Sequence, residues 1–181
     1  MRKLLAALVG QALPPAHLAT VAIILTCVAH SQTNWRPLFN GDNLEGWSGP
    51  GAAFAVDDGA IRTQTGGLLR YTREKIGDVT LRVVYRISKG NSESSIVIRD
   101  GEKVRLDTGV IDGVTKPIAL ASKAPGEWNT MDITIKGAHV VVKLNDVLVT
   151  DHTGRQVDAS YIAIEHPNDR AVVYVREVSV Q

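Results

Sequence analysis

The chain has 181 residues, 44% of them hydrophobic and 5% aromatic, with a formal net charge of +1. Such a balanced charge excludes the strongly basic surface that attracts nucleic acid or an anionic membrane. The single cysteine excludes a disulfide within the chain, so the fold must be stabilised by packing alone. The length fits a short leader followed by one domain with a single core.

Residues 1–31 have the layout of a secretory signal peptide. A short basic start is followed by an apolar run from Leu18 to Val28, and small residues precede a possible cleavage site between Ser31 and Gln32. The run is shorter than the roughly 20 residues that span a bilayer, which favours cleavage over a membrane anchor. We therefore expect a secreted or periplasmic protein with no membrane association after cleavage.

Two alternatives for the leader stay open, an uncleaved anchor and a lipoprotein. The only cysteine, Cys27, lies in this leader, but the residues before it are not the small ones that precede a lipidated cysteine. Cleavage would remove Arg2 and Lys3, which leaves 18 basic against 19 acidic residues and a net charge of −1 in residues 32–181. Nothing in that balance predicts a nucleic-acid partner.

Residues 32–181 contain no convincing amphipathic helix, no internal repeat and no low-complexity segment. The segment from Trp35 to Trp47 is rich in Gly, Asn and Asp, and we expect a loop held in place by buried aromatic side chains. Short alternating segments separated by turn residues predict an antiparallel two-layer sandwich or a barrel. The predicted strands are Phe54 to Val56, Ala60 to Thr63, Leu68 to Thr72, Val79 to Ser88, Ser94 to Arg99, Glu102 to Asp107, Met131 to Lys136, Val140 to Leu144, Val147 to Asp151, Tyr161 to Glu165 and Val172 to Val180.

The longest alternation, from Val79 to Ser88, separates a core face of odd-numbered residues from an outer face that includes Arg82 and Arg86. Downstream, Asp100-Gly101 is a two-residue hairpin signal whose register pairs Val97 with Val104. The opposite face of this hairpin then carries three charged side chains: Lys103, Arg105 and Asp107. These faces form a charged platform if the strands share one sheet; the alternative is that they are ordinary solvated faces.

A second hairpin is predicted around Asn145-Asp146, two residues that tolerate positive φ. Its register pairs Leu144 with Val147 and Val142 with Val149, so we expect these four side chains to be buried together. A meander with one buried face needs a second layer to cover it, which again predicts a sandwich.

Four stretches of the sequence resemble the successive signatures of the 3-keto-disaccharide hydrolase family: NWRPLFNGDNLEGW, LLRYTREKIGDVTLRVVYRISKGNS, PGEWNTMDITIKGAHVVVKLNDVLVTD and VVYVREVSVQ. The resemblance covers nearly all of residues 32–181 in the right order. It implies an all-β fold, an antiparallel two-sheet jelly-roll sandwich of the concanavalin A-like lectin/glucanase type. It also implies a sugar site on the concave sheet and cleavage of glycosides oxidised at C3 of the sugar.

The chain departs from the family pattern at two positions where the family typically has carboxylates, which here are Val84 and Lys103, and Arg105 replaces a typical Gln. Elimination from a 3-keto glycoside needs a base for the proton beside the ketone and electrophilic help for the enolate. The candidate catalytic residues are Asp107 as the leading base, with Lys103 and Arg105; Glu93 and Glu165 are the next candidates for the base. The candidate substrate-binding residues are Arg82, Arg86, Asn91, Glu93, Glu165 and His166.

Two classes of function stay open. The first is an exported hydrolase or lyase acting on 3-keto glycosides. The second is a catalytically reduced relative that binds a saccharide or a protein partner through the same concave face. Neither the resemblance nor the spacing of His, Asp and Glu residues implies a cofactor or a metal site, and the sequence predicts no oligomeric state.

Overall fold

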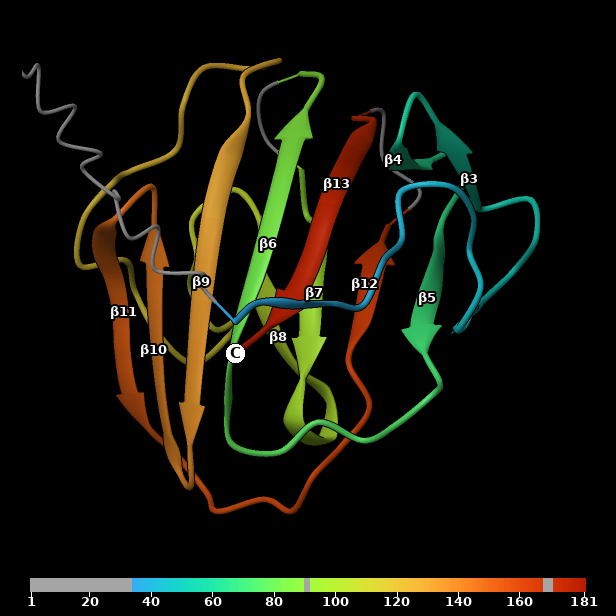
Figure 1. The fold of residues 1–181 in the computed structure, drawn as a ribbon. Helices are drawn as coiled ribbons and strands as arrows, with labels where there is room; N and C mark the ends of the chain where they lie inside the picture. Colours follow the sequence, from blue (N-terminus) through green and yellow to red (C-terminus); the bar gives the residue numbers. More distant parts are fainter. Residues whose placement is uncertain (1–33, 90–91, 168–170) are drawn as a thin grey trace, which may run out of the picture. The chain divides into compact units, whose positions relative to one another are not determined.

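The computed structural model describes residues 34–89, 92–167 and 171–181 (Figure 1). The predicted leader, residues 1–31, lies outside the described residues. Within the described ranges, no helix is both long enough and apolar enough to cross a membrane.

The larger of two antiparallel sheets has eight strands in the order β11-β10-β9-β6-β13-β4-β3, with β1 beside β13. In Figure 1 its strand β13, in red, lies next to β6, in green. The strands are β1 (Arg36–Pro37), β3 (Phe54–Asp57), β4 (Ala60–Thr63), β6 (Val79–Ile87), β9 (Asn129–Lys136), β10 (His139–Leu144), β11 (Val147–Thr153) and β13 (Val173–Val180).

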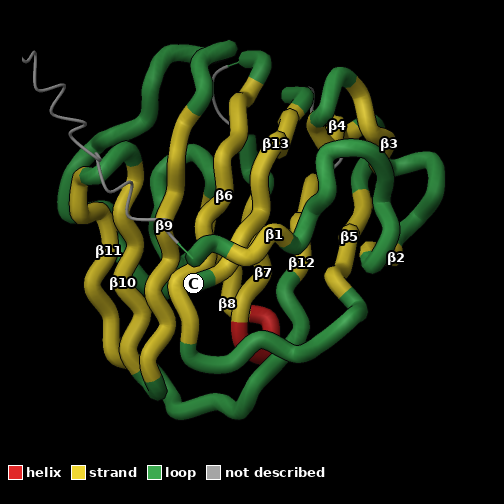
Figure 2. Tube along the Cα trace, viewed as in Figure 1, coloured by secondary structure: helices red, strands yellow, loops and turns green. Residues whose placement is uncertain are grey.

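The smaller sheet has five strands in the order β2-β5-β12-β7-β8. They are β2 (Trp47–Ser48), β5 (Gly67–Tyr71), β12 (Ala163–His166), β7 (Ser95–Ile98) and β8 (Glu102–Arg105). The one helical element of the described residues is a 3₁₀ turn at Arg99–Gly101, shown in red in Figure 2. The antiparallel two-sheet sandwich predicted from the sequence is confirmed.

The core lies between the inner faces of the two sheets. The predicted core face of β6 is confirmed, because Leu81, Val83 and Tyr85 are fully buried. The first loop is held by Trp47, which is buried and whose Nε1 donates a hydrogen bond to the carbonyl oxygen of Leu38 at 2.9 Å. This contact confirms that aromatic burial fixes the segment from Trp35 to Trp47.

The predicted register of the β7–β8 hairpin is wrong by one residue. The turn contains Arg99, Asp100 and Gly101, so Ile96 pairs with Val104, and Val97 pairs with Lys103. The predicted register would have placed Ile96 and Ile98 on the charged face. The observed register buries both isoleucines together with Val104, which is the favourable arrangement for apolar side chains.

The β10–β11 hairpin has the predicted two-residue turn, with φ of 50° at Asn145 and 67° at Asp146, and Leu144 pairs with Val147 as expected. A bulge then shifts the register, so that Val142 lies opposite Thr150 rather than Val149. Val142, Leu144 and Val149 are buried, but Val147 is 42% exposed. The prediction that Val147 belongs to the core is therefore wrong; this residue begins β11 directly after the turn.

Gly109 packs tightly against these buried valines and has a φ of +72°. A Cβ at this position would lie 2.5 Å from Cγ2 of Val149 and 3.3 Å from Cγ1 of Val142. We expect Gly109→Ala to lower the free energy of unfolding by about 1–3 kcal/mol, because the added methyl group overpacks the core. The matched control is Gly113→Ala, since Gly113 has a φ of +70° and nothing within 4 Å. Equal losses in chemical denaturation would contradict the packing argument and leave backbone strain as the whole cause.

Candidate functional site

The outer face of the five-stranded sheet carries a charged hollow. Cross-strand pairing places Ala163, Val97 and Ser95 in its middle, and these small side chains form a low floor. Longer charged side chains flank this floor: Arg70, Glu165, Lys103 and Arg105. The result is a cavity of about 410 Å³ lined by Arg70, Lys103 and Glu165, with a neighbouring cavity of about 240 Å³ that reaches Arg105.

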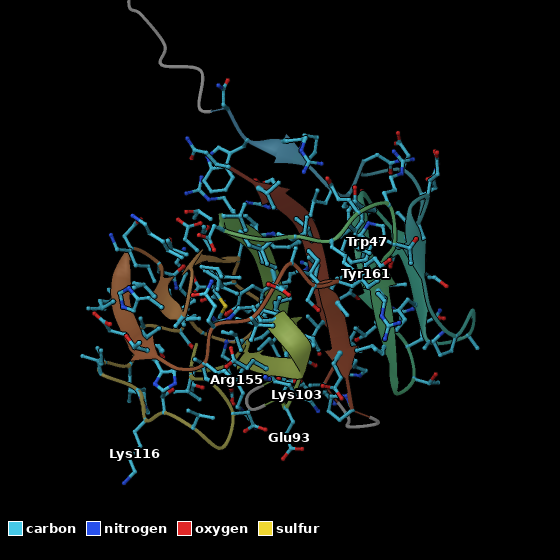
Figure 3. The ribbon with its side chains drawn as sticks, turned by 90° about the horizontal axis from the view of Figure 1, so that it is seen from below. Trp47, Glu93, Lys103, Lys116, Arg155 and Tyr161 are labelled. Atoms are coloured by element: carbon cyan, nitrogen blue, oxygen red, sulfur yellow. The ribbon has the colours of Figure 1, made fainter. Side chains whose placement is uncertain are left out.

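Lys103 on β8 and Glu165 on β12 form an ion pair across this floor, and both side chains line both cavities. Nζ of Lys103 lies 2.9 Å from Oε1 and 2.8 Å from Oε2 of Glu165. The side chains are 44% and 31% exposed, so a ligand in the hollow can reach both charges. Glu93 lies on the rim of the smaller cavity, and Figure 3 shows it near Lys103.

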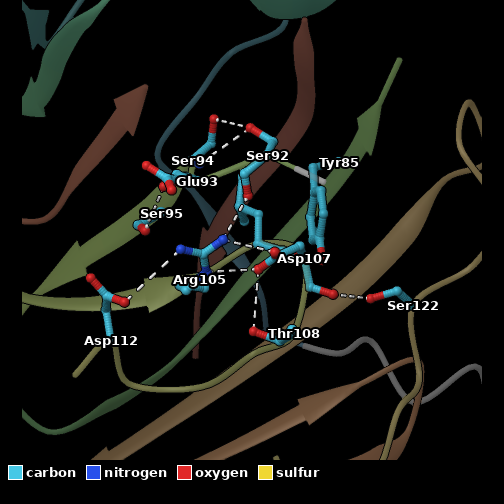
Figure 4. A network of polar contacts seen from close by, with 11 residues as sticks. Tyr85, Ser92, Glu93, Ser94, Ser95, Arg105, Asp107, Thr108, Asp112 and Ser122 are labelled. Atoms are coloured by element: carbon cyan, nitrogen blue, oxygen red, sulfur yellow. Dashed lines mark hydrogen bonds and ion pairs between the residues drawn. The ribbon is translucent and has the colours of Figure 1, made fainter. Parts of the chain in front are cut away.

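Arg105 is held differently, by a network of fixed hydrogen bonds (Figure 4). Its Nε and Nη2 donate to the two carboxylate oxygens of Asp107 at 2.9 and 2.8 Å, and Nη2 also donates to the carbonyl oxygen of Ser92 at 3.2 Å. The hydrogen bonds to Asp107 raise the pKa of Arg105 despite the opposing effect of desolvation. Arg105 therefore supplies a permanent positive charge of fixed orientation beside the hollow.

Asp107 is correspondingly occupied by this network. Besides the two bonds from Arg105, its Oδ1 accepts a hydrogen bond from Oγ1 of Thr108 at 3.2 Å. Asp107 lines a separate cavity of about 190 Å³ at the sandwich end, with Ser122 and Lys123, and is not among the residues that line the charged hollow. Both oxygens of the Asp107 carboxylate are therefore occupied by hydrogen bonds from Arg105.

Tyr85 reaches the same region from the other sheet. Its hydroxyl donates to the carbonyl oxygen of Leu106, next to Asp107. Burial, with a smaller contribution from the charge of Asp107, raises the pKa of Tyr85 well above its usual range. The hydroxyl of Tyr85 thus links β6 of one sheet to Leu106, which follows β8 of the other sheet.

Arg82 and Arg86 lie on β6 in the eight-stranded sheet, so the prediction that they adjoin Lys103 is wrong. Strand β6 pairs with β9 and β13, and the neighbour of β8 in the other sheet is β7. Arg82 instead makes two hydrogen bonds to Asp132, at 2.7 and 2.8 Å, which raise its pKa. The two arginines thus occupy the opposite outer face of the sandwich.

His166 was expected at the rim of the sugar site, but it is 2% exposed and cannot contact a ligand in the hollow. Since Glu165 points outward, the next residue along the strand points into the core. Nδ1 of His166 lies 2.7 Å from Oγ of the buried Ser94. Asn91, the remaining expected contact, lies outside the described residues.

Sequence reasoning missed Arg70 and Tyr161, which line the larger cavity, and Asp112, which lines the smaller one. The alternation of β5 could have placed Arg70 on an outer face, since its neighbours Leu69 and Tyr71 are buried. Within residues 34–89, 92–167 and 171–181, no group of three or more His, Cys, Asp or Glu side chains is arranged to hold a metal ion.

The family model described as 3-keto-alpha-glucoside-1,2-lyase-like domain matches residues 34–181. A candidate glycosyl hydrolase from Parabacteroides distasonis superposes with a TM-score of 0.70 at 19% identity, over 81% of this chain and 98% of the other. The β-glucanase of Bacillus licheniformis gives 0.58 at 12% identity over 80% and 96% of the two chains.

A carbohydrate-binding module of Bacillus subtilis, CBM66, gives a TM-score of 0.53 at 13% identity over 74% and 93% of the two chains. No curated protein matches the chain in sequence. At these identities the structural likeness concerns the fold, a sandwich of the concanavalin A-like lectin/glucanase type.

Proposed function

Because the chain belongs to the family of 3-keto-alpha-glucoside-1,2-lyase-like domains, we propose that it cleaves glycosides oxidised at C3 of the sugar. The observation that carries this proposal is the ion pair of Lys103 and Glu165 across the floor of the hollow. A carboxylate and an ammonium group, both accessible and within 3 Å of each other, supply the base and the electrophile that such an elimination needs.

In the proposed reaction, Glu165 removes the proton from C2 of the sugar, which is acidic because C3 is a ketone. The C–H electrons form an enolate, and the ammonium of Lys103 stabilises its oxygen. The enolate then forms the C1–C2 double bond as the C1–O bond to the leaving group breaks. The leaving oxygen takes the proton from Glu165, which restores the carboxylate, so the products are a 1,2-unsaturated 3-keto sugar and a free alcohol.

The geometry favours Glu165 over Asp107 as the base. The hydrogen bonds of Asp107 to Arg105 hold it outside the hollow, whereas the partner of Glu165 is a single flexible ammonium group that can turn towards a ligand. We assign to Asp107 the role of orienting Arg105, and to Arg70 that of contacting sugar hydroxyls. The exposed ring of Tyr161 provides an apolar wall at the end of the cavity.

The test uses residues 34–181 and 4-nitrophenyl 3-keto-α-glucoside, with nitrophenol release as the readout. We expect Glu165→Gln to lower kcat by at least about a hundredfold, the usual contribution of a general base, while substrate binding persists. Exchange of the C2 proton in deuterium oxide should fall in parallel. The matched control is Glu45→Gln, since Glu45 pairs with Arg73 on the surface away from the hollow, and it should leave turnover unchanged. Full activity of the Glu165 variant would overturn the assignment.

One observation favours a second candidate function, a saccharide-binding module without catalysis. The family that the sequence resembles typically has carboxylates at two positions. In this chain those positions are Val84 and Lys103. In that case the wild-type protein releases no nitrophenol, yet binds the 3-keto glucoside more tightly than a Lys103→Ala variant does. The apolar leader, residues 1–31, motivates the further proposal that either function is exercised in secreted or periplasmic space.

A further inference from the structure

The outer face of the eight-stranded sheet carries a group of arginines and aromatic rings that the proposed reaction does not use. Arg86 on β6 lies with its Cζ 5.0 Å from the ring centre of Trp128 and 4.4 Å from that of Tyr174. Arg176 lies 4.4 Å from the same Trp128 ring, and Arg62 is the cross-strand neighbour of Tyr174. We refer to these five residues as the Arg86 cluster.

The guanidinium of Arg86 has no hydrogen-bond acceptor among the residues that the structure describes. Within the described part of the chain it makes no hydrogen bond and no ion pair, and its buried Nε lacks a partner. Arg82, on the same strand face, shows the contrast, because both oxygens of Asp132 bind its guanidinium. Two aromatic rings hold Arg86 in place, so its positive charge is oriented but not neutralised.

Arg62 and Arg176, the other two arginines of the cluster, add further positive charge beside Arg86. Arg86 and Arg176 lie within 5.0 and 4.4 Å of the Trp128 ring centre, so their guanidinium carbons are less than 10 Å apart. For Arg62 the nearest carboxylate contact is a 3.9 Å approach to Asp57, and both side chains are partly exposed. Glu177 on this face accepts a hydrogen bond from Ser179. Three cations in this arrangement repel one another and favour an added anion.

We propose that the Arg86 cluster binds the carboxylate of an acidic saccharide, a uronate unit of a polymer. The planar donor fork of arginine matches a carboxylate in two hydrogen bonds, and the half-buried rings of Trp128 and Tyr174 offer an apolar surface beside it. The site lies on the opposite outer face from the hollow with Lys103 and Glu165. A uronate polymer bound there leaves the hollow open, so the two sites can hold their ligands at the same time.

The near-neutral charge of the domain favours a saccharide over nucleic acid. Nucleic-acid binding rests on many phosphate contacts along a basic stripe, whereas this face also carries Asp132, Glu177 and Asp57. A polymer with one carboxylate per sugar and neutral hydroxyls between them fits an isolated group of three arginines.

The experiment measures binding of tetragalacturonate to residues 34–181 by calorimetry at low salt. We expect wild-type binding and at least about a tenfold loss of affinity in Arg86→Met and in Arg176→Met, since each removes hydrogen bonds to a charged group. Arg176 is exposed, so its replacement tests the site even if Arg86→Met fails to fold. The matched control, Arg73→Met, removes an arginine from a surface pair with Glu45 and should bind normally.

Further arms of the experiment identify the ligand and separate the two sites. The methyl ester of tetragalacturonate should bind at least about tenfold more weakly, because esterification removes the charges. Glu165→Gln should bind tetragalacturonate as the wild type does, whether or not the domain cleaves 3-keto glycosides. Absence of wild-type binding, unchanged affinity in both arginine variants, or equally tight binding of an oligonucleotide of the same charge would each overturn the proposal.

Discussion

Replacing Arg99 with leucine is expected to lower the free energy of unfolding by about 3 kcal/mol, because it removes two hydrogen bonds of a buried charged group, each contributing about 1.5 kcal/mol or more. Its side chain is 3% exposed. Nη2 donates to Glu102 at 3.0 Å, and Nη1 donates to the carbonyl oxygen of Gly137 at 2.7 Å. Arg99 therefore joins the β7–β8 turn to the β9–β10 turn of the other sheet, and its loss leaves both acceptors without this donor.

Urea denaturation at neutral pH measures the effect. The control is Arg73→Leu, which breaks an arginine–glutamate pair of 2.5 Å whose side chains are 55% and 69% exposed. Such a surface pair contributes at most about 1 kcal/mol. If the two variants lose the same free energy of unfolding, the buried contact of Arg99 with the opposite sheet contributes no more to stability than a surface ion pair.

The second large effect is expected from Leu144→Ala, which should cost about 2–5 kcal/mol through lost burial and the remaining cavity. Leu144 is fully buried and lies opposite Met131 on β9. The adjacent Lys143 points to the outer face and is exposed, so Lys143→Ala should change stability by less than about 0.5 kcal/mol. Similar melting temperatures for the two variants would mean that the assigned inner face of β10 is incorrect.

Alternation of apolar residues was sufficient to predict most strands and the inner face of β6, because burial of one sheet face forces a period of two. It could not tell which strands share a sheet. Arg82 and Lys103 both lie on outward faces, yet they belong to opposite sheets, since pairing partners far apart in sequence leave no local signal. The family resemblance supplied the fold class that the pattern left between sandwich and barrel.

The candidate site was only partly predictable for the same reason. Lys103 and Arg105 were assigned to one outward face. The register error did not change this face, because both residues alternate with the buried Val104 on β8, although their partners are Val97 and Ser95 rather than Ile98 and Ile96. The contact of Lys103 with Glu165 depends on β12 joining β7, a long-range pairing that alternation does not encode. The burial of His166 follows from the strand period once Glu165 is known to face outward.

The position of β13 between β6 and β4 has a consequence for how the chain folds. While β12 is being synthesised, β9, β10 and β11 can already pair with β6, but the β3–β4 hairpin has no neighbour in its sheet. An isolated two-stranded hairpin is marginally stable in water. The β3–β4 hairpin therefore becomes stable only after β13 has paired with β4. We therefore expect β6 and the following meander to form the folding nucleus, and insertion of β13 to be the late step, with the slow kinetics of distant strand pairing.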